Sequence, residues 1–166
     1  MEQVNYTPIE ILLIEDNEDD VLLTTHAFKK GKVSNNIHVA PDGVEALAFL
    51  KREGKYAAAP RSDIILLDLN LPRMNGHELL KVIKSDPLFA AIPVIILTTS
   101  KADEDVLKAY KNHSNCFISK PVIMEDFEKV IRMLENFWFM IVRLPQEKDG
   151  KSSAEAGSSQ QKSGDL

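Results

Sequence analysis

The sequence predicts an α/β domain: a doubly wound, five-stranded parallel sheet with five helices. Five short apolar runs recur along the chain, and segments with helical periodicity follow them. Three of the runs are apolar without alternation, which is typical of strands buried on both faces. Parallel strands need crossovers, and helices usually provide them with right-handed connections. The expected strands are residues 11–14, 37–39, 64–67, 94–97 and 116–118.

The expected helices have recognisable signals at their ends. Asn17 is a suitable N-cap for the first helix, and the acids at 18–20 suit the positive end of its dipole. Asp42 is a suitable N-cap for the second helix. Gly31 and Gly54 are placed to end these two helices. The apolar positions of the three later helices are Leu79, Leu80 and Ile83, then Val106, Ala109 and Tyr110, then Phe127, Val130, Ile131, Leu134, Trp138 and Ile141.

The composition narrows the class of protein. The chain has 166 residues, of which 44% are hydrophobic and 27% charged, as expected for one globular domain. The net charge of −5 makes nucleic acid and anionic membrane poor candidates for a partner. A single cysteine excludes an internal disulfide and a thiolate metal cage, and it suits the reducing cytoplasm, where we expect the protein. The longest apolar run, 137–142, is too short to span a bilayer.

The chain is expected to have three parts. Residues 1–8 form a short polar N-terminal extension, and residues 9–144 form the folded domain. Residues 145–166 have no aromatic or β-branched residue and consist mainly of Ser, Gly, Gln, Lys and Glu. Such a segment buries too little apolar surface to offset its ordering entropy, so we expect a disordered tail.

Five side chains that could bind a metal or take part in a reaction are expected at the carboxyl ends of the strands. Glu15 and Asp16 follow the first strand, Asp68 the third, Thr98 the fourth and Lys120 the fifth. Sites in open α/β sheets form at this edge. Clustered carboxylates without His or Cys favour Mg²⁺, and a carboxylate can be a nucleophile toward phosphorus. Each residue alone has an ordinary structural explanation, but their common edge favours a phosphoryl-transfer site.

The motifs around these residues closely resemble those of response-regulator receiver domains in two-component signalling. The resemblance implies the flavodoxin-like receiver fold over about residues 9–144, with Asp68 as the phosphorylated residue and Thr98 and Lys120 assisting. It also implies that Mg²⁺ is bound by the side chains of Glu15, Asp16 and Asp68 and by the backbone carbonyl of Asn70. The motifs are residues 14–17, 66–76, 94–100 and 119–121.

The resemblance implies further local features. Thr98 would be a switch hydroxyl, and Phe117 would be an aromatic switch that moves with it. The alternative for Phe117 is an ordinary half-buried strand aromatic. The Lys120–Pro121 bond would be cis, and Gly76 would permit tight backbone packing after the phosphorylation loop.

The implied function is a binding module switched by phosphorylation. A sensor histidine kinase would phosphorylate it, and the chain would catalyse only its own phosphoryl transfer and dephosphorylation. Residues 52–61, 115–117 and 137–145 resemble the stand-alone receivers associated with phytochrome-type kinases. A phosphatase of the haloacid-dehalogenase type would need a second Asp two residues after Asp68, where this chain has Asn70. A purely structural adaptor would not need the five residues.

The apolar sequence at the end of the fifth helix predicts that the protein forms a homodimer. Phe137, Trp138, Met140 and Ile141 are the expected interface residues, because this end is apolar on several faces and must be covered. In the alternative, this end folds back onto its own domain, or the kinase or another target covers it.

Overall fold

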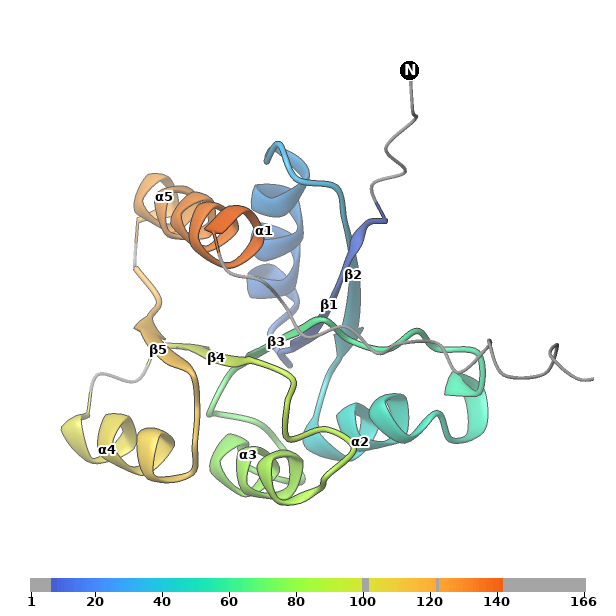
Figure 1. Cartoon of the computed structure of the whole chain (residues 1–166). Helices are drawn as coiled ribbons and strands as arrows, with labels where there is room; N and C mark the ends of the chain where they lie inside the picture. The colour runs from blue at the N-terminus through green and yellow to red at the C-terminus, as the bar shows by residue number, and fades with distance from the viewer. Residues whose placement is uncertain (1–6, 100–101, 122, 142–166) are drawn as a thin grey trace, which may run out of the picture.

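A computed structural model describes residues 7–99, 102–121 and 123–141 (Figure 1). It contains a parallel five-stranded sheet with the strand order β2-β1-β3-β4-β5. This order confirms the doubly wound fold predicted from the sequence. The strands are β1 (Ile9–Ile14), β2 (Asn35–Ala40), β3 (Ile64–Leu67), β4 (Val94–Thr98) and β5 (Cys116–Ser119).

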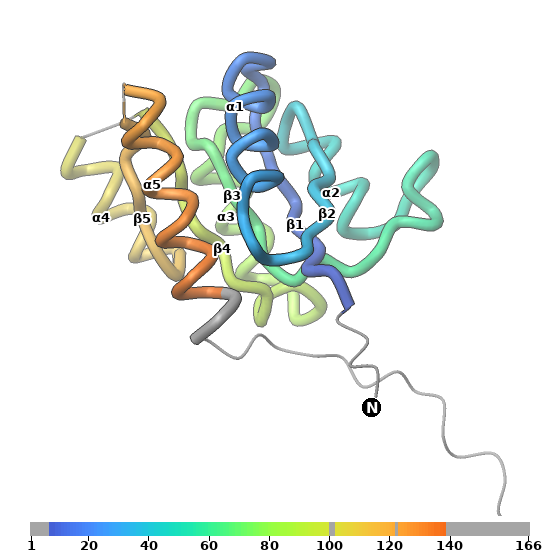
Figure 2. The backbone as a smooth tube through the Cα atoms, turned by 90° about the horizontal axis from the view of Figure 1, so that it is seen from above, coloured from blue at the N-terminus to red at the C-terminus, as the bar shows by residue number. Residues whose placement is uncertain are grey.

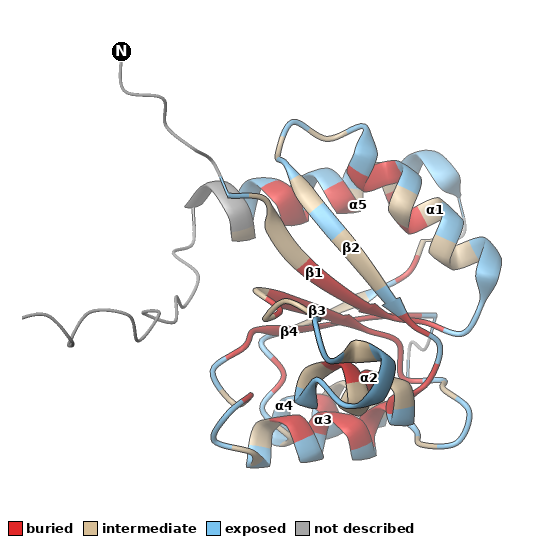
Figure 3. Ribbon diagram, turned by 90° about the vertical axis from the view of Figure 1, so that its right-hand side faces the viewer, coloured by how far each residue is buried: buried red, intermediate tan, exposed pale blue. Residues whose placement is uncertain are grey.

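Helices cover both faces of the sheet (Figures 1 and 3). On one face α1 and α5 lie side by side, and the view from above shows them next to each other (Figure 2). On the other face lie α2, α3 and α4. No helix in the described part of the chain is long and apolar enough to cross a membrane. The bounds are α1 (Glu18–Lys29), α2 (Gly43–Lys51), η1 (Gly54–Tyr56), α3 (Gly76–Ser85), α4 (Asp103–Lys111) and α5 (Met124–Leu134).

The central strands are buried on both faces, as their continuous apolar sequences predict. Leu12 and Ile14 of β1 belong to the core cluster under α2, α3 and α4. Ile11 and Leu13 of the same strand belong to the cluster under α1 and α5. Because successive side chains of a strand point to opposite faces, one apolar strand supplies both halves of the core.

The helix N-caps are confirmed, but the C-terminal ends differ in detail from the prediction. The side chains of Asn17 and Asp42 each accept a hydrogen bond from the backbone N–H three residues later, at 3.0 and 2.8 Å. The second helix ends before Gly54, because Arg52 takes the left-handed conformation with φ of 56° and closes the helix. Gly54, with φ of 56°, instead begins the short 3₁₀ turn.

The fifth helix does not keep α-helical geometry to its end. A π-helical segment, η2 (Glu135–Ile141), follows α5, and its wider turn shifts the apolar stripe predicted from α-helical periodicity. Trp138 still packs on the core beneath α1 and α5. Glu135 is only 4% exposed, and burial raises the pKa of its carboxyl group. A Cβ on Gly31 would lie 1.9 Å from Glu135 Oε1, so the glycine also leaves room for this carboxyl group.

Gly76 permits close packing at the start of α3, as expected. A Cβ there would lie 2.6 Å from the carbonyl oxygen of Asp68 and 2.6 Å from Leu69 Cα.

We predict that Gly76→Ala lowers the free energy of unfolding by about 2 kcal/mol, because the backbone must move to relieve the overlap. Denaturant unfolding measures this loss. Lys81→Ala, an exposed change on the same helix, should cost less than about 0.5 kcal/mol, and an equal loss in both variants would contradict the explanation.

Candidate phosphorylation and metal site

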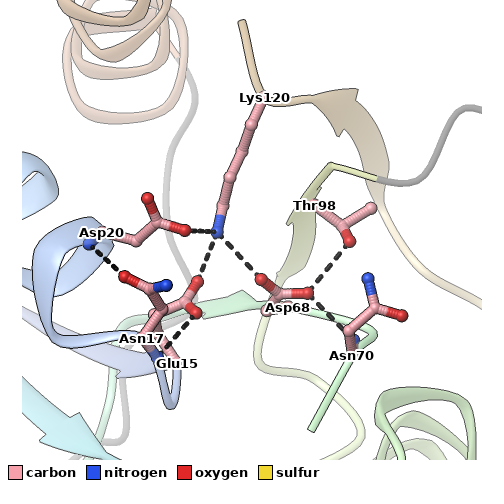
Figure 4. A network of polar contacts seen from close by, with 7 residues as sticks. All are labelled: Glu15, Asn17, Asp20, Asp68, Asn70, Thr98 and Lys120. Atoms are coloured by element: carbon pink, nitrogen blue, oxygen red, sulfur yellow. Dashed lines mark hydrogen bonds and ion pairs between the residues drawn. The ribbon is translucent and has the colours of Figure 1, made fainter. Parts of the chain in front are cut away.

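The carboxyl ends of the strands bring together four of the five predicted side chains. Glu15 follows β1, Asp68 follows β3, Thr98 ends β4 and Lys120 follows β5, and all four are buried (Figure 4). β2 and β3 lie on opposite sides of β1, so the order of the sheet reverses at β1 and β3. The loops after these strands therefore diverge, and the crevice between them is where doubly wound folds place their sites.

Lys120 lies at the centre of the site. Its ammonium group donates hydrogen bonds to Glu15 Oε2, to Asp68 Oδ2 at 2.8 Å and to Asp20 Oδ2 at 3.0 Å (Figure 4). These contacts use all three ammonium donors. Burial alone would lower the pKa of Lys120, but the bonds to Asp68 and Glu15 outweigh it and raise the pKa. The lysine is therefore a permanent cation among three carboxyl groups.

Asp68 is held as a carboxylate with both oxygens contacted. Its Oδ1 accepts hydrogen bonds from Thr98 Oγ1 and from the Asn70 backbone N–H, each at 2.9 Å. Its Oδ2 accepts from Lys120. Burial would raise the pKa of Asp68, but its hydrogen bonds, first those with Glu15 and Lys120, outweigh burial and lower the pKa. The ionised form is the nucleophilic one.

Glu15 behaves differently from Asp68 although the two carboxyl groups are neighbours. Burial, with a further contribution from Asp68, raises the pKa of Glu15 to about 7. Its Oε1 accepts a hydrogen bond from the Asn17 backbone N–H at 3.1 Å. Adjacent carboxyl groups commonly have pKa values pushed apart in this way, because the second negative charge is unfavourable beside the first.

The donor atoms fit a divalent metal ion. Glu15, Asp20 and Asp68 each offer a carboxylate oxygen, and these oxygens all lie within 4.8 Å of one another. Oxygen donors of this kind suit hard cations such as Mg²⁺. Asp16, expected as a ligand, is exposed and outside this group, and Asn70 contacts Asp68 through its N–H.

Sequence reasoning treated Asp20 only as a helix-dipole acid and missed its place in the site. A usable signal was present: Asp20 lies in the first turn of α1, only a few residues after the strand-end acids Glu15 and Asp16.

Two further expectations concern β5 and the loop after it. Phe117 is half-buried and packs on the core under α2, α3 and α4, a position compatible with either role considered for it. No peptide bond between described residues is cis, so the expected cis bond between Lys120 and Pro121 is a wrong prediction. Lys120 reaches Asp68 with the trans bond, which X-Pro peptides favour by about 0.5–1 kcal/mol.

The predicted interface residues are only partly described. Phe137 is 52% exposed, and its ring meets that of Trp138 edge-on with centroids 5.5 Å apart. The side chains of Met140 and Ile141 lie outside the described part of the structure, as do residues 1–6 of the expected extension and all of the expected tail.

The fold and this arrangement of acids, hydroxyl and lysine define a receiver domain. The chain belongs to the response regulator receiver domain family, whose model matches residues 11–132.

Individual relatives narrow the comparison. Response regulator Rcp1 of Synechocystis sp. is 40% identical over 138 residues, which are 83% of this chain and 94% of Rcp1. The crystal structure of the Mn²⁺-bound form of Rcp1 superposes with a TM-score of 0.80, covering 84% of this chain and 100% of that one. The phosphorylated cyanobacterial phytochrome response regulator RcpA superposes with a TM-score of 0.81 at 40% identity, with the same coverage.

Proposed function

We propose that a phytochrome-type sensor histidine kinase phosphorylates this chain on Asp68 with Mg²⁺, and that phosphorylation alters its binding surface. The observation that carries the proposal is the buried Asp68 carboxyl group, which accepts hydrogen bonds from Lys120 and Thr98. The resemblance to RcpA, a phosphorylated phytochrome response regulator, supports the modification and the kinase class. The Mn²⁺-bound form of Rcp1 supports a divalent metal.

The geometry supplies the groups that phosphoryl transfer needs. An Asp68 carboxylate oxygen attacks the phosphorus of the kinase phosphohistidine; the new P–O bond forms as the P–N bond breaks, and the imidazole leaves with the bonding electron pair. Lys120 and Thr98 are placed to interact with phosphoryl oxygens. Mg²⁺, held by Glu15, Asp16, Asp68 and the Asn70 carbonyl, would supply further positive charge.

The buried hydroxyl of Thr98 is the starting point for the switch. Phosphorylation adds a charge of about −1.5 to −2 to the Asp68 carboxyl group, which Thr98 already contacts. Movement of Thr98 toward the phosphoryl group would open space beside Phe117 on the neighbouring strand, where Thr98 pairs with Ser119 in register. The surface made by α4, β5 and α5 would then change by a shift between two packings.

Phosphorylation at Asp68 is directly testable. With Mg²⁺ and acetyl phosphate, or with a phosphorylated histidine kinase, wild-type protein should gain the mass of one phosphoryl group by intact-mass spectrometry. Asp68→Asn should gain none, because the amide is not a nucleophile of this kind. Asp63→Asn, a change in another strand-flanking acid, is the matched control and should be phosphorylated normally. Equal phosphorylation of Asp68→Asn and wild type would refute the assignment.

The metal ligands are tested by binding. Mg²⁺ titrations followed by NMR shifts should show that Asp68→Asn and Asp16→Asn each weaken affinity about tenfold or more, since each removes a proposed oxygen ligand. Asp19→Asn changes the same charge at an exposed neighbouring position and should have much less effect. Unchanged affinity in Asp16→Asn would remove that residue from the ligand set.

We further propose a homodimer built on α5 and the segment after it. An apolar cavity of about 320 Å³ lies at the edge of the sheet, where β5 has no outer strand neighbour among the described residues. Met133 and Phe137, which line it, are 61% and 52% exposed. A two-fold assembly covers such a surface with a second copy of itself. The remaining lining residues are Asn115, Cys116, Ile118, Val130, Leu134 and Trp138.

The dimer predicts a clear effect of charge on this surface. Sedimentation equilibrium at tens of micromolar should find a dimer for wild type and a monomer for Phe137→Glu, because an unpaired carboxylate would be buried in the interface. Leu88→Glu, which changes an even more exposed apolar residue in the turn between α3 and β4, should remain dimeric. A monomeric wild type, with or without phosphorylation, would contradict the proposal.

A further inference from the structure

Asp20 makes one of the three contacts of the Lys120 ammonium group, yet none of the proposed steps uses it. The 3.0 Å ion pair joins the first turn of α1 to the loop after β5. The two side chains differ in burial: that of Lys120 is 5% exposed and that of Asp20 is 33% exposed. In Figure 4, Asp20 approaches the ammonium group from the α1 side, and Asp68 approaches it from the opposite side.

The other two contacts of Lys120 conflict with metal binding. Glu15, Asp20 and Asp68 all contact the ammonium group and lie close enough together to hold a metal, but only Glu15 and Asp68 belong to the ligand set proposed above. A divalent cation bound by these carboxylates competes with the ammonium group for the same oxygens. A buried ammonium group that loses its partners is strongly unfavourable, so Lys120 needs a carboxylate that the metal leaves available.

We infer that Asp20 is a positioning residue: it retains the Lys120 ammonium group at the site when the metal takes Glu15 and Asp68. The inference rests on the proposed Mg²⁺-dependent phosphorylation of Asp68. Asp20 keeps the lysine beside the acceptor, so that its charge is in place when the phosphoryl group arrives. Two other roles are distinguishable by experiment: a direct metal ligand, or an exposed acid that only favours the helix dipole.

The first experiment measures phosphorylation by acetyl phosphate at saturating Mg²⁺, together with Mg²⁺ affinity. Asp20→Asn should lower the rate about tenfold, the scale of one lost charge-assisted hydrogen bond, while changing the Mg²⁺ dissociation constant less than about threefold. Asp19→Asn is the matched control: the same charge and size change in the same turn, at an exposed position. It should leave both quantities close to wild type. Asp20→Glu should restore most of the rate.

The substitution leaves the helix cap in place, because Asn17 accepts its hydrogen bond from the backbone N–H of residue 20. A loss of rate is therefore not explained by loss of the cap.

The second experiment needs no metal and no phosphoryl donor. Thermal unfolding in EDTA compares the effect of Asp20→Asn in wild type and in Lys120→Met. Without the ammonium group, Asp20 keeps its interaction with the helix dipole but loses its attractive partner and repels its neighbouring carboxylates, so its removal should be more favourable there. The shift in midpoint should differ between the two backgrounds by about 3 °C or more, whereas Asp19→Asn should give equal shifts.

Each contrary result has a definite meaning. If Asp20→Asn weakens Mg²⁺ binding as much as Asp68→Asn does, Asp20 is a metal ligand and the inference is wrong. If Asp20→Asn matches Asp19→Asn in rate, or shifts the midpoint equally in both backgrounds, Asp20 does not act through Lys120. Failure of wild-type phosphorylation would instead overturn the proposed function, whatever Asp20 does.

Discussion

The attraction between one buried ammonium group and three carboxyl groups is the constraint on which the site depends. Lys120 is 105 residues from Glu15 in the sequence and 52 from Asp68. Without a cation, the carboxyl groups would repel one another in surroundings where water screens them poorly. The lysine therefore fixes the distances between the loops after β1, β3 and β5, and the site is preformed. Its geometry also makes the lysine a natural competitor of the metal.

Sheet topology explains why residues so distant in sequence meet. A parallel sheet sends every strand's carboxyl end to one edge, and the reversal of order at β1 and β3 opens a crevice between their loops. The core below is apolar on both faces, so the strands hold their polar ends in a fixed position. Gly76 then lets α3 begin directly against the backbone of Asp68. The reactive carboxylate is positioned by packing that contains no catalytic group.

Most of the fold was predictable because its causes are local. Continuous apolar runs identify buried strands, and the caps Asn17 and Asp42 work through backbone groups three residues away. Four site residues were predictable because they directly follow or end strands. Asp20 was not found because its role depends on a lysine 100 residues away. Helical periodicity alone did not predict the left-handed Arg52 that closes α2 or the π-helical turn that begins at Glu135.

The close approach of Glu135 to Gly31 has a consequence for sequence change. The carboxyl group fills the space that any side chain at position 31 would occupy, so the two positions form a compensating pair. A larger residue at 31 requires either that the Glu135 carboxyl group rotates away or that position 135 becomes smaller. Variation at the turn after α1 is thus linked to the segment that carries Phe137.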